Sequence, residues 1–169
     1  MTRIAIIIAA LLASAPTFAQ EGHSAALGCY GEAGASGQST TIDKETQRSI
    51  KQMGVGTGCN VQAGTFVVGG GLRLDTGAGG RSASVTAKAG VPINSGLFAY
   101  GLAAYSMDAG QRLDANNGVL AAGLGVEIAL SKNLAGYFEL QKDIARLGTA
   151  KSLDEQTVVR AGVRVYLGK

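Results

Sequence analysis

The sequence predicts an all-β chain whose apolar side chains face outward, and three observations support this. First, small apolar residues in 83–91 alternate with Ser84, Thr86, Lys88 and Gly90, a period of two that is typical of a strand with two different faces. Second, eight such segments follow one another, joined alternately by short turns and longer connections. Third, the polar faces carry about one charge per strand among Gly, Ala and Ser, far fewer than a water-facing sheet normally carries. Together these features predict an eight-stranded antiparallel up-and-down transmembrane β-barrel.

The N-terminal residues predict a cleavable signal peptide. Arg3 supplies a positive charge, an apolar run covers 4–12, and small residues follow. The run is too short to cross a bilayer as a helix. We expect cleavage after Ala19, which divides the chain into a signal peptide, 1–19, and a barrel domain, 20–169. Cleavage after Ala15 and a buried N-terminal helix are the alternatives.

Composition narrows the class of protein further. The chain has 26 Gly, 2 Pro and no Trp, and its glycines lie inside alternating segments, which indicates close backbone packing rather than a linker. The formal net charge is +3, and it falls to +2 when Arg3 leaves with the signal peptide. Such a weak balance predicts no nucleic-acid partner.

The predicted strands are justified in order by their alternation and by what separates them. Short turns with Gly, Pro or Asn follow the second, fourth and sixth strands ("QAGT", "PINSG" and "SKN"). The polar run 39–52 after the first strand is interpreted as a solvated loop, and a role in receptor or surface binding is the alternative. The predicted strands are 25–38, 53–61, 66–75, 81–91, 97–107, 118–130, 134–141 and 157–167.

The two cysteines predict a disulfide, because an exported chain can keep one. If the first hairpin is centred near Lys44, Cys29 stands opposite Cys59 at a distance that a bridge can span. Neither cysteine has metal-binding spacing, and the single histidine is His23. Two unpaired thiols are the alternative.

The polar faces should point into the barrel, where acidic and basic groups can compensate one another. Eight strands enclose a space that side chains can fill, so no open diffusion pore is expected. The fifth strand has no assignable face. Phe66, Phe98, Tyr105 and Phe138 are candidates for aromatic girdles at the membrane interfaces. The expected interior polar network consists of Glu32, Arg73, Lys88, Glu127, Glu139, Arg160 and Arg164.

Three segments resemble the small porin-like, opacity-type outer-membrane proteins of Gram-negative bacteria. "CNVQAGTFVVGGGLRLD" is similar to a strand–turn–strand segment of that family, and "AGLGVEIALSKNLAGYFELQ" to its Gly-x-Gly-x-Glu strand with the turn and strand that follow. "RAGVRVYLGK" is similar to the carboxy-terminal signal read by the barrel-insertion machinery, although it ends in Gly168-Lys169 instead of an aromatic residue. The residues that match this insertion signal are Arg160, Gly162, Val165 and Leu167.

The resemblance implies an eight-stranded barrel in the outer membrane, surrounded by lipid and lipopolysaccharide, with roles in envelope integrity and surface contact. It implies no reaction and no cofactor, so the leading hypothesis is a non-enzymatic envelope barrel. A lipid-modifying enzyme is an alternative, but His23 precedes the first strand and no Ser-His-Asp set is evident. A soluble lipocalin-like barrel, whose apolar faces line a cavity, is the third possibility.

Overall fold

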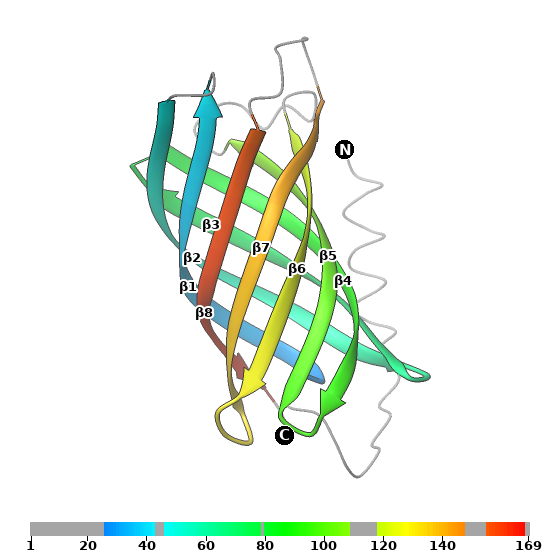
Figure 1. The fold of residues 1–169 in the computed structure, drawn as a ribbon. Coiled ribbons are helices and arrows are strands. Elements are labelled where there is room, and N and C mark those ends of the chain that lie inside the picture. The colour runs from blue at the N-terminus through cyan, green and yellow to red at the C-terminus, as the bar shows by residue number, and fades with distance from the viewer. Residues whose placement is uncertain (1–25, 43–45, 79, 109–117, 148–154, 168–169) are drawn as a thin grey trace, which may run out of the picture.

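The structure is a computed structural model that describes residues 26–42, 46–78, 80–108, 118–147 and 155–167. Eight antiparallel strands close into one barrel, because the last strand pairs with the first (Figure 1). The predicted fold class is confirmed. The predicted signal peptide and His23 lie outside the described residues. The strands are β1 (Gly28–Ile42), β2 (Thr46–Ala63), β3 (Phe66–Gly77), β4 (Gly80–Asn94), β5 (Leu97–Asp108), β6 (Val119–Ala129), β7 (Leu134–Arg146) and β8 (Glu155–Tyr166).

The alternation in the sequence becomes an alternation of buried and exposed side chains. In β4, Lys88 is 7% exposed and Ser84 is buried, whereas Val85 between them is 39% exposed. The apolar side is therefore the outside of the barrel, as predicted. The lipocalin-like alternative, in which apolar side chains line the cavity, is wrong for this fold.

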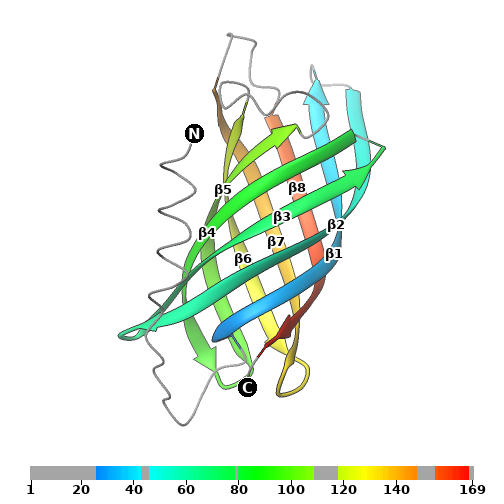
Figure 2. The ribbon, with the colours of Figure 1, turned by 180° about the vertical axis from the view of Figure 1, so that it is seen from behind.

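The register of the strands sets how far they tilt. A path across paired residues, from Gln38 in β1 backward through β8 to β2, returns to β1 at Gly28, a displacement of ten residues. For eight strands at ordinary spacing this displacement corresponds to a tilt of about 40°. The tilt is visible on the front and back walls of the barrel (Figures 1 and 2). The interior of an eight-stranded barrel is just wide enough for side chains to fill it.

The tight turns gather at one end of the barrel, as the alternation of connections predicted. The turns after β2, β4 and β6 and the end of β8 lie at this end, which we call the turn rim (Figure 1). In the β2–β3 turn Gly64 has φ of 65°, a left-handed conformation that glycine adopts without strain. In the β4–β5 turn the Gly96 N–H donates to Asn94 Oδ1 at 2.9 Å. We call the opposite end the loop rim. The strands are joined there by the connections after β1, β3, β5 and β7.

The first hairpin is longer than predicted. The run 39–52 is strand apart from the undescribed residues 43–45, and the ladder continues to the pair Ile42 and Thr46. The interpretation of this run as a loop is therefore wrong. A strand that rises above the membrane can be polar on both faces, so it loses the alternation that marks it in the sequence while keeping its hydrogen bonds. For the same reason β7 continues past the predicted end at residue 141 to Arg146.

Candidate functional site

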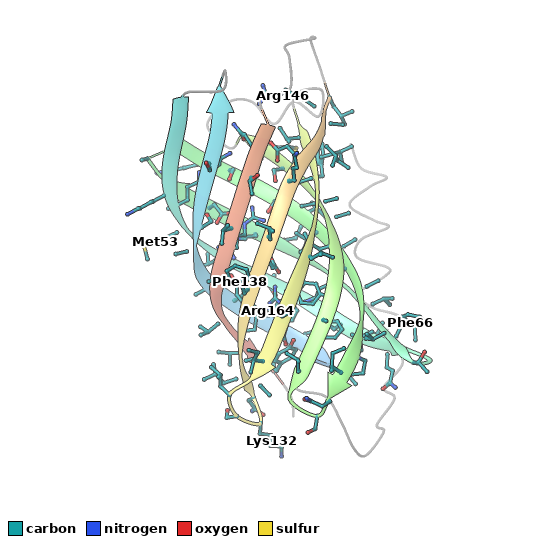
Figure 3. The ribbon with its side chains drawn as sticks, in the orientation of Figure 1. Met53, Phe66, Lys132, Phe138, Arg146 and Arg164 are labelled. Carbon is teal, nitrogen blue, oxygen red and sulfur yellow. A yellow bond between two sulfur atoms is a disulfide. The ribbon has the colours of Figure 1, made fainter. Side chains whose placement is uncertain are left out.

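The outer surface of the barrel carries a broad apolar band. Among the described residues, twenty-two large apolar side chains are exposed, from Met53 at 71% to Val68 at 36%. Met53 and Phe66 point away from the barrel (Figure 3), Phe138 is 48% exposed, and Arg164 is only 3% exposed. Soluble proteins rarely expose a contiguous apolar patch larger than a few hundred Å². The hydrocarbon core of a membrane is a favourable environment for such an apolar band. A closed barrel also suits this environment, because it leaves no strand edge unpaired within the hydrocarbon.

Among the described residues, the exposed charged side chains lie toward the ends of the strands or in a turn, and all of them are basic. Lys51, Arg81, Lys142 and Arg146 are near the loop-rim ends of their strands, and Lys132 lies in the β6–β7 turn at the other end. Among the side chains that the structure describes, these five are the only exposed charged ones. Their positions bracket the apolar band between two polar boundaries, as a bilayer requires.

The face of β5, which alternation could not assign, is now defined. Phe98, Tyr100, Leu102 and Ala104 are buried, and the intervening residues turn outward. Phe98 is only 3% exposed and its ring stacks on Tyr100 at a centroid distance of 5.0 Å. Its assignment to a girdle is therefore wrong, because both faces of β5 are apolar and the sequence carries no signal for the inward one. Phe66 and Phe138 are exposed, as a girdle requires, and Tyr105 is half-buried.

Arg164 is the centre of the interior polar network. Its guanidinium donates from Nε to Glu32 Oε2 at 2.8 Å and from Nη2 to Glu139 Oε1 at 2.7 Å. Nη1 donates to Glu127 Oε2 at 2.7 Å and to the Tyr100 hydroxyl at 3.0 Å. Arginine suits this place because its rigid fork of five N–H donors can serve several acceptors at once. One side chain of β8 thus connects β1, β5, β6 and β7 across the lumen.

Arg73 forms a second centre nearer the loop rim. Its guanidinium donates to Glu32 Oε1 at 3.2 Å, to Asp75 Oδ1 at 2.8 Å and to the Tyr137 hydroxyl. Arg160 Nη2 lies 3.8 Å from Asp75 Oδ2, so Asp75 pairs with two cations. Glu32 joins the two centres because each of its carboxylate oxygens accepts from a different arginine.

Sequence reasoning missed Asp75, although it shares its inward face with Arg73 at the end of β3. With Asp75 included, four carboxylates match the four cationic groups predicted for the interior. A balanced set of this kind can stay ionised in an enclosed space, where unpaired charges are very costly.

Lys88 belongs to the interior but not through the ion pairs expected of it. Its ammonium lies 4.6 Å from the centroid of the Tyr30 ring and 5.1 Å from that of Tyr100, and its Nζ has no hydrogen-bond partner among the described residues. Electron-rich ring faces attract a cation at these distances. The tyrosines were missing from the predicted network, although Tyr30, Tyr137 and Tyr166 occupy positions on its polar faces.

Inward glycines make room for these rings. A Cβ added to Gly58 would lie 2.5 Å from the Tyr30 hydroxyl, and one added to Gly125 would lie 2.5 Å from the Tyr100 ring. Both distances are too short for real contacts. Each of these glycines is paired with the tyrosine it would contact, so the glycines of β2 and β6 leave room for the tyrosine ring of the adjacent strand.

The predicted disulfide is confirmed. Cys29 and Cys59 stand opposite each other in the β1–β2 register, with Cα atoms 3.9 Å apart, and they are bonded. Odd-numbered residues of both strands face outward, so the bridge lies on the outside of the barrel near the turn rim. It holds the first hairpin in register and leaves the lumen free for the polar network.

The four residues matched to the insertion signal divide between the two faces of β8. Arg160 is buried and Gly162 shares its inward face, whereas Val165 and Leu167 are exposed. Their recognition by insertion machinery stays a prediction. No group of three or more described His, Cys, Asp or Glu side chains is arranged to hold a metal ion. Within the same described ranges, no helix is long and apolar enough to cross a membrane.

The barrel is closed, its outer surface carries an apolar band, and its lumen is polar. This combination is typical of outer-membrane β-barrels. Solved structures agree with this. Ail, the attachment invasion locus protein of Yersinia pestis, superposes with a TM-score of 0.55 at 16% identity, over 82% of this chain and 98% of its own. Neisserial surface protein A superposes with a TM-score of 0.57 at 16% identity, over 87% of this chain and 100% of its own. Both are small eight-stranded outer-membrane barrels of Gram-negative bacteria.

At this level of identity the likeness concerns the fold alone. No family model matches the sequence, and no curated protein matches it. The resemblance to small outer-membrane barrels is confirmed for the architecture.

Proposed function

We propose that this chain is a non-enzymatic barrel of the bacterial outer membrane that contributes to envelope structure, holds a polar hairpin at the cell surface and has no open pore. The single observation that carries the proposal is the inverted arrangement of the barrel. Its exposed surface is apolar over the middle of the strands, and its ionised groups are enclosed and paired.

The connections suggest the orientation in the membrane. Outer-membrane barrels have short turns on the periplasmic side and longer connections outside the cell. The turn rim would therefore face the periplasm, and the extended β1–β2 hairpin would stand outside. The predicted signal peptide would deliver the chain to the periplasm, where barrel-insertion machinery would act on the β8 signal.

The interior network supports a sealed lumen. Arg164 bonds to carboxylates on three other strands, and Tyr30, Tyr100 and Tyr137 pack around the same guanidinium. A hydrated ion could pass only if these contacts separated, which would expose charges to a poorly hydrated interior. We therefore expect conductance close to that of the bare bilayer.

The basic groups near the loop rim support contact with lipopolysaccharide. Lys142 and Arg146 lie four positions apart on β7, both exposed, with the exposed Ile144 between them. Phosphate groups at the outer boundary of the apolar band would be attracted to such side chains. This contact would anchor the barrel at its depth in the outer leaflet.

Fractionation of cells that produce the protein, combined with electrophoresis of heated and unheated samples, tests the location and the fold. We expect recovery with outer membranes and a mobility that changes only when the sample is boiled. Recovery as a soluble periplasmic protein would overturn the proposal. Planar-bilayer recordings of the purified barrel test the seal, and steady single-channel currents would contradict it.

A further inference from the structure

The β1–β2 hairpin has one strand edge without a neighbour in the described structure. β2 pairs with β1 from Asn60 to Thr46, whose partner is Ile42. On its other side β2 pairs with β3 only as far as Gln52, whose partner is Gly77. Gly77 pairs with Gly80, so β3 turns into β4 at this level, and the hairpin rises past that turn (Figure 2). We call residues 46–51 of β2 the open edge.

The hydrogen-bonding pattern shows which backbone groups face the open edge. The Leu167 N–H donates to the Cys29 carbonyl at 2.8 Å, so the backbone of Cys29 points toward β8 and away from β2. Its partner Cys59 consequently points its backbone groups toward β3, and so does every second residue of β2. The Lys51 carbonyl indeed lies against Gly77. Beyond it, the N–H and C=O groups of Gln47 and Ser49 face outward along the edge.

The open edge stands outside the apolar band. Met53 on β2 and Leu74 on β3 are the last large exposed apolar side chains before the edge begins. Lys51 and Arg81 follow at this height, both exposed. Arg81 lies on β4 at the level of Met53, so its Cα is two strands and two residues away from that of Lys51, a distance of about 12 Å. Two positive charges therefore flank the base of the edge.

We propose that the open edge binds an extended segment of another protein as an added strand, and that this segment carries acidic side chains. An unpaired strand edge is complementary to the backbone of any extended peptide, and strand addition of this kind is a general mode of peptide recognition. Lys51 and Arg81 supply the preference for acidic side chains. The proposal rests on the proposed function, because the hairpin must stand outside the cell to meet a partner.

A second copy of this chain is a poorer occupant of the edge. It would bring its own Lys51 and Arg81 to the same contact, and like charges placed opposite each other destabilise a strand pair. An acidic segment forms opposite-charge pairs at the same positions.

The test uses the full mature barrel, folded in detergent, and three labelled nine-residue peptides measured by fluorescence anisotropy. One peptide alternates valine with glutamate, the second has lysine in place of glutamate, and the third is the glutamate peptide with a central proline. We expect the glutamate peptide to bind about tenfold more tightly than the lysine peptide and the proline peptide not to bind. Equal binding of the first two, or undiminished binding of the third, would overturn the proposal.

Variants of the barrel separate the backbone from the charges. Ser49→Pro removes an N–H that faces the open edge but no bond to β1, so binding should be lost, whereas Ser49→Ala should bind as the original protein does. The double variant Lys51→Glu with Arg81→Glu reverses both charges and should bind the lysine peptide more tightly than the glutamate peptide. Lys132→Glu, at the opposite rim, is the matched control and should change nothing.

Heat-modifiable migration establishes that each variant is folded before its binding is measured. Full binding by folded Ser49→Pro would contradict the proposal, as would a concentration-dependent dimer that Ser49→Pro abolishes. Because binding is measured on the purified barrel, its failure leaves the outer-membrane proposal standing. A soluble periplasmic location would overturn the outer-membrane proposal whatever the peptides do.

Discussion

Replacing Arg164 by methionine perturbs the barrel at the residue that joins most of its strands. The change keeps much of the side-chain volume but removes every donor of the guanidinium. Glu32 keeps its contact with Arg73 at 3.2 Å. Glu127 and Glu139 lose the cation to which each is bonded at 2.7 Å. Their remaining hydrogen bonds come from neutral groups, including the Tyr166 and Tyr100 hydroxyls.

The expected loss follows from leaving buried carboxylates without a cation. Removing one partner of a buried pair costs about 3–5 kcal/mol, and most of that cost is the charge left behind. We therefore expect Arg164→Met to lower the free energy of unfolding by about 4 kcal/mol. Adding Glu127→Gln and Glu139→Gln in the same chain should recover more than half of the loss, because neutral amides need no cation.

The assay is urea-induced unfolding of the barrel in detergent micelles or lipid vesicles. The chain has no Trp, so we suggest circular dichroism together with the shift in gel mobility of unheated samples. Arg81→Met, which removes an exposed guanidinium, is the control and should stay within about 0.5 kcal/mol of the original protein. A loss below about 1 kcal/mol for Arg164→Met, or no recovery in the triple variant, would refute the reasoning.

Three further predictions use the same unfolding measurement. Asp75→Asn should cost about 2–3 kcal/mol, because Arg73 and Arg160 both lose a charged partner, and an unchanged midpoint would mean that the contacts of Asp75 contribute little. Leu124→Arg places a charge on the outward face in the middle of β6 and should cost about 2–4 kcal/mol in vesicles, whereas a water-exposed site would tolerate it. Reduction of the disulfide should lower stability by about 3 kcal/mol without opening the barrel, and a reduced protein that no longer shows heat-modifiable migration would contradict its supporting role.

Much of the fold could be predicted because its signals are local. A period of two identifies a strand and its faces without any knowledge of its neighbours, and this placed Lys88, Glu127 and Arg164 in the interior correctly. The same locality gave the Cys29–Cys59 register, since a hairpin pairs residues at equal distances from its centre. Where alternation is absent, this signal is missing. The face of β5 could therefore not be predicted, and residues 39–52 of the first hairpin were wrongly interpreted as a loop.

On the strands whose two faces differ in polarity, the sequence by itself determined which side chains face lipid and which face the lumen, because side-chain direction along a strand depends only on odd or even position. Only the closed structure determined which inward-facing side chains contact one another in the lumen. Arg164 reaches acids on β1, β6 and β7 because the strands tilt and the register advances by ten residues around the barrel. That displacement is a property of all eight pairings together, so no single segment contains it. The open edge of β2 likewise depends on two pairings, because β1 pairs with β2 up to Thr46 whereas β3 pairs with it only up to Gln52. It can be recognised only when the positions of both neighbouring strands are known.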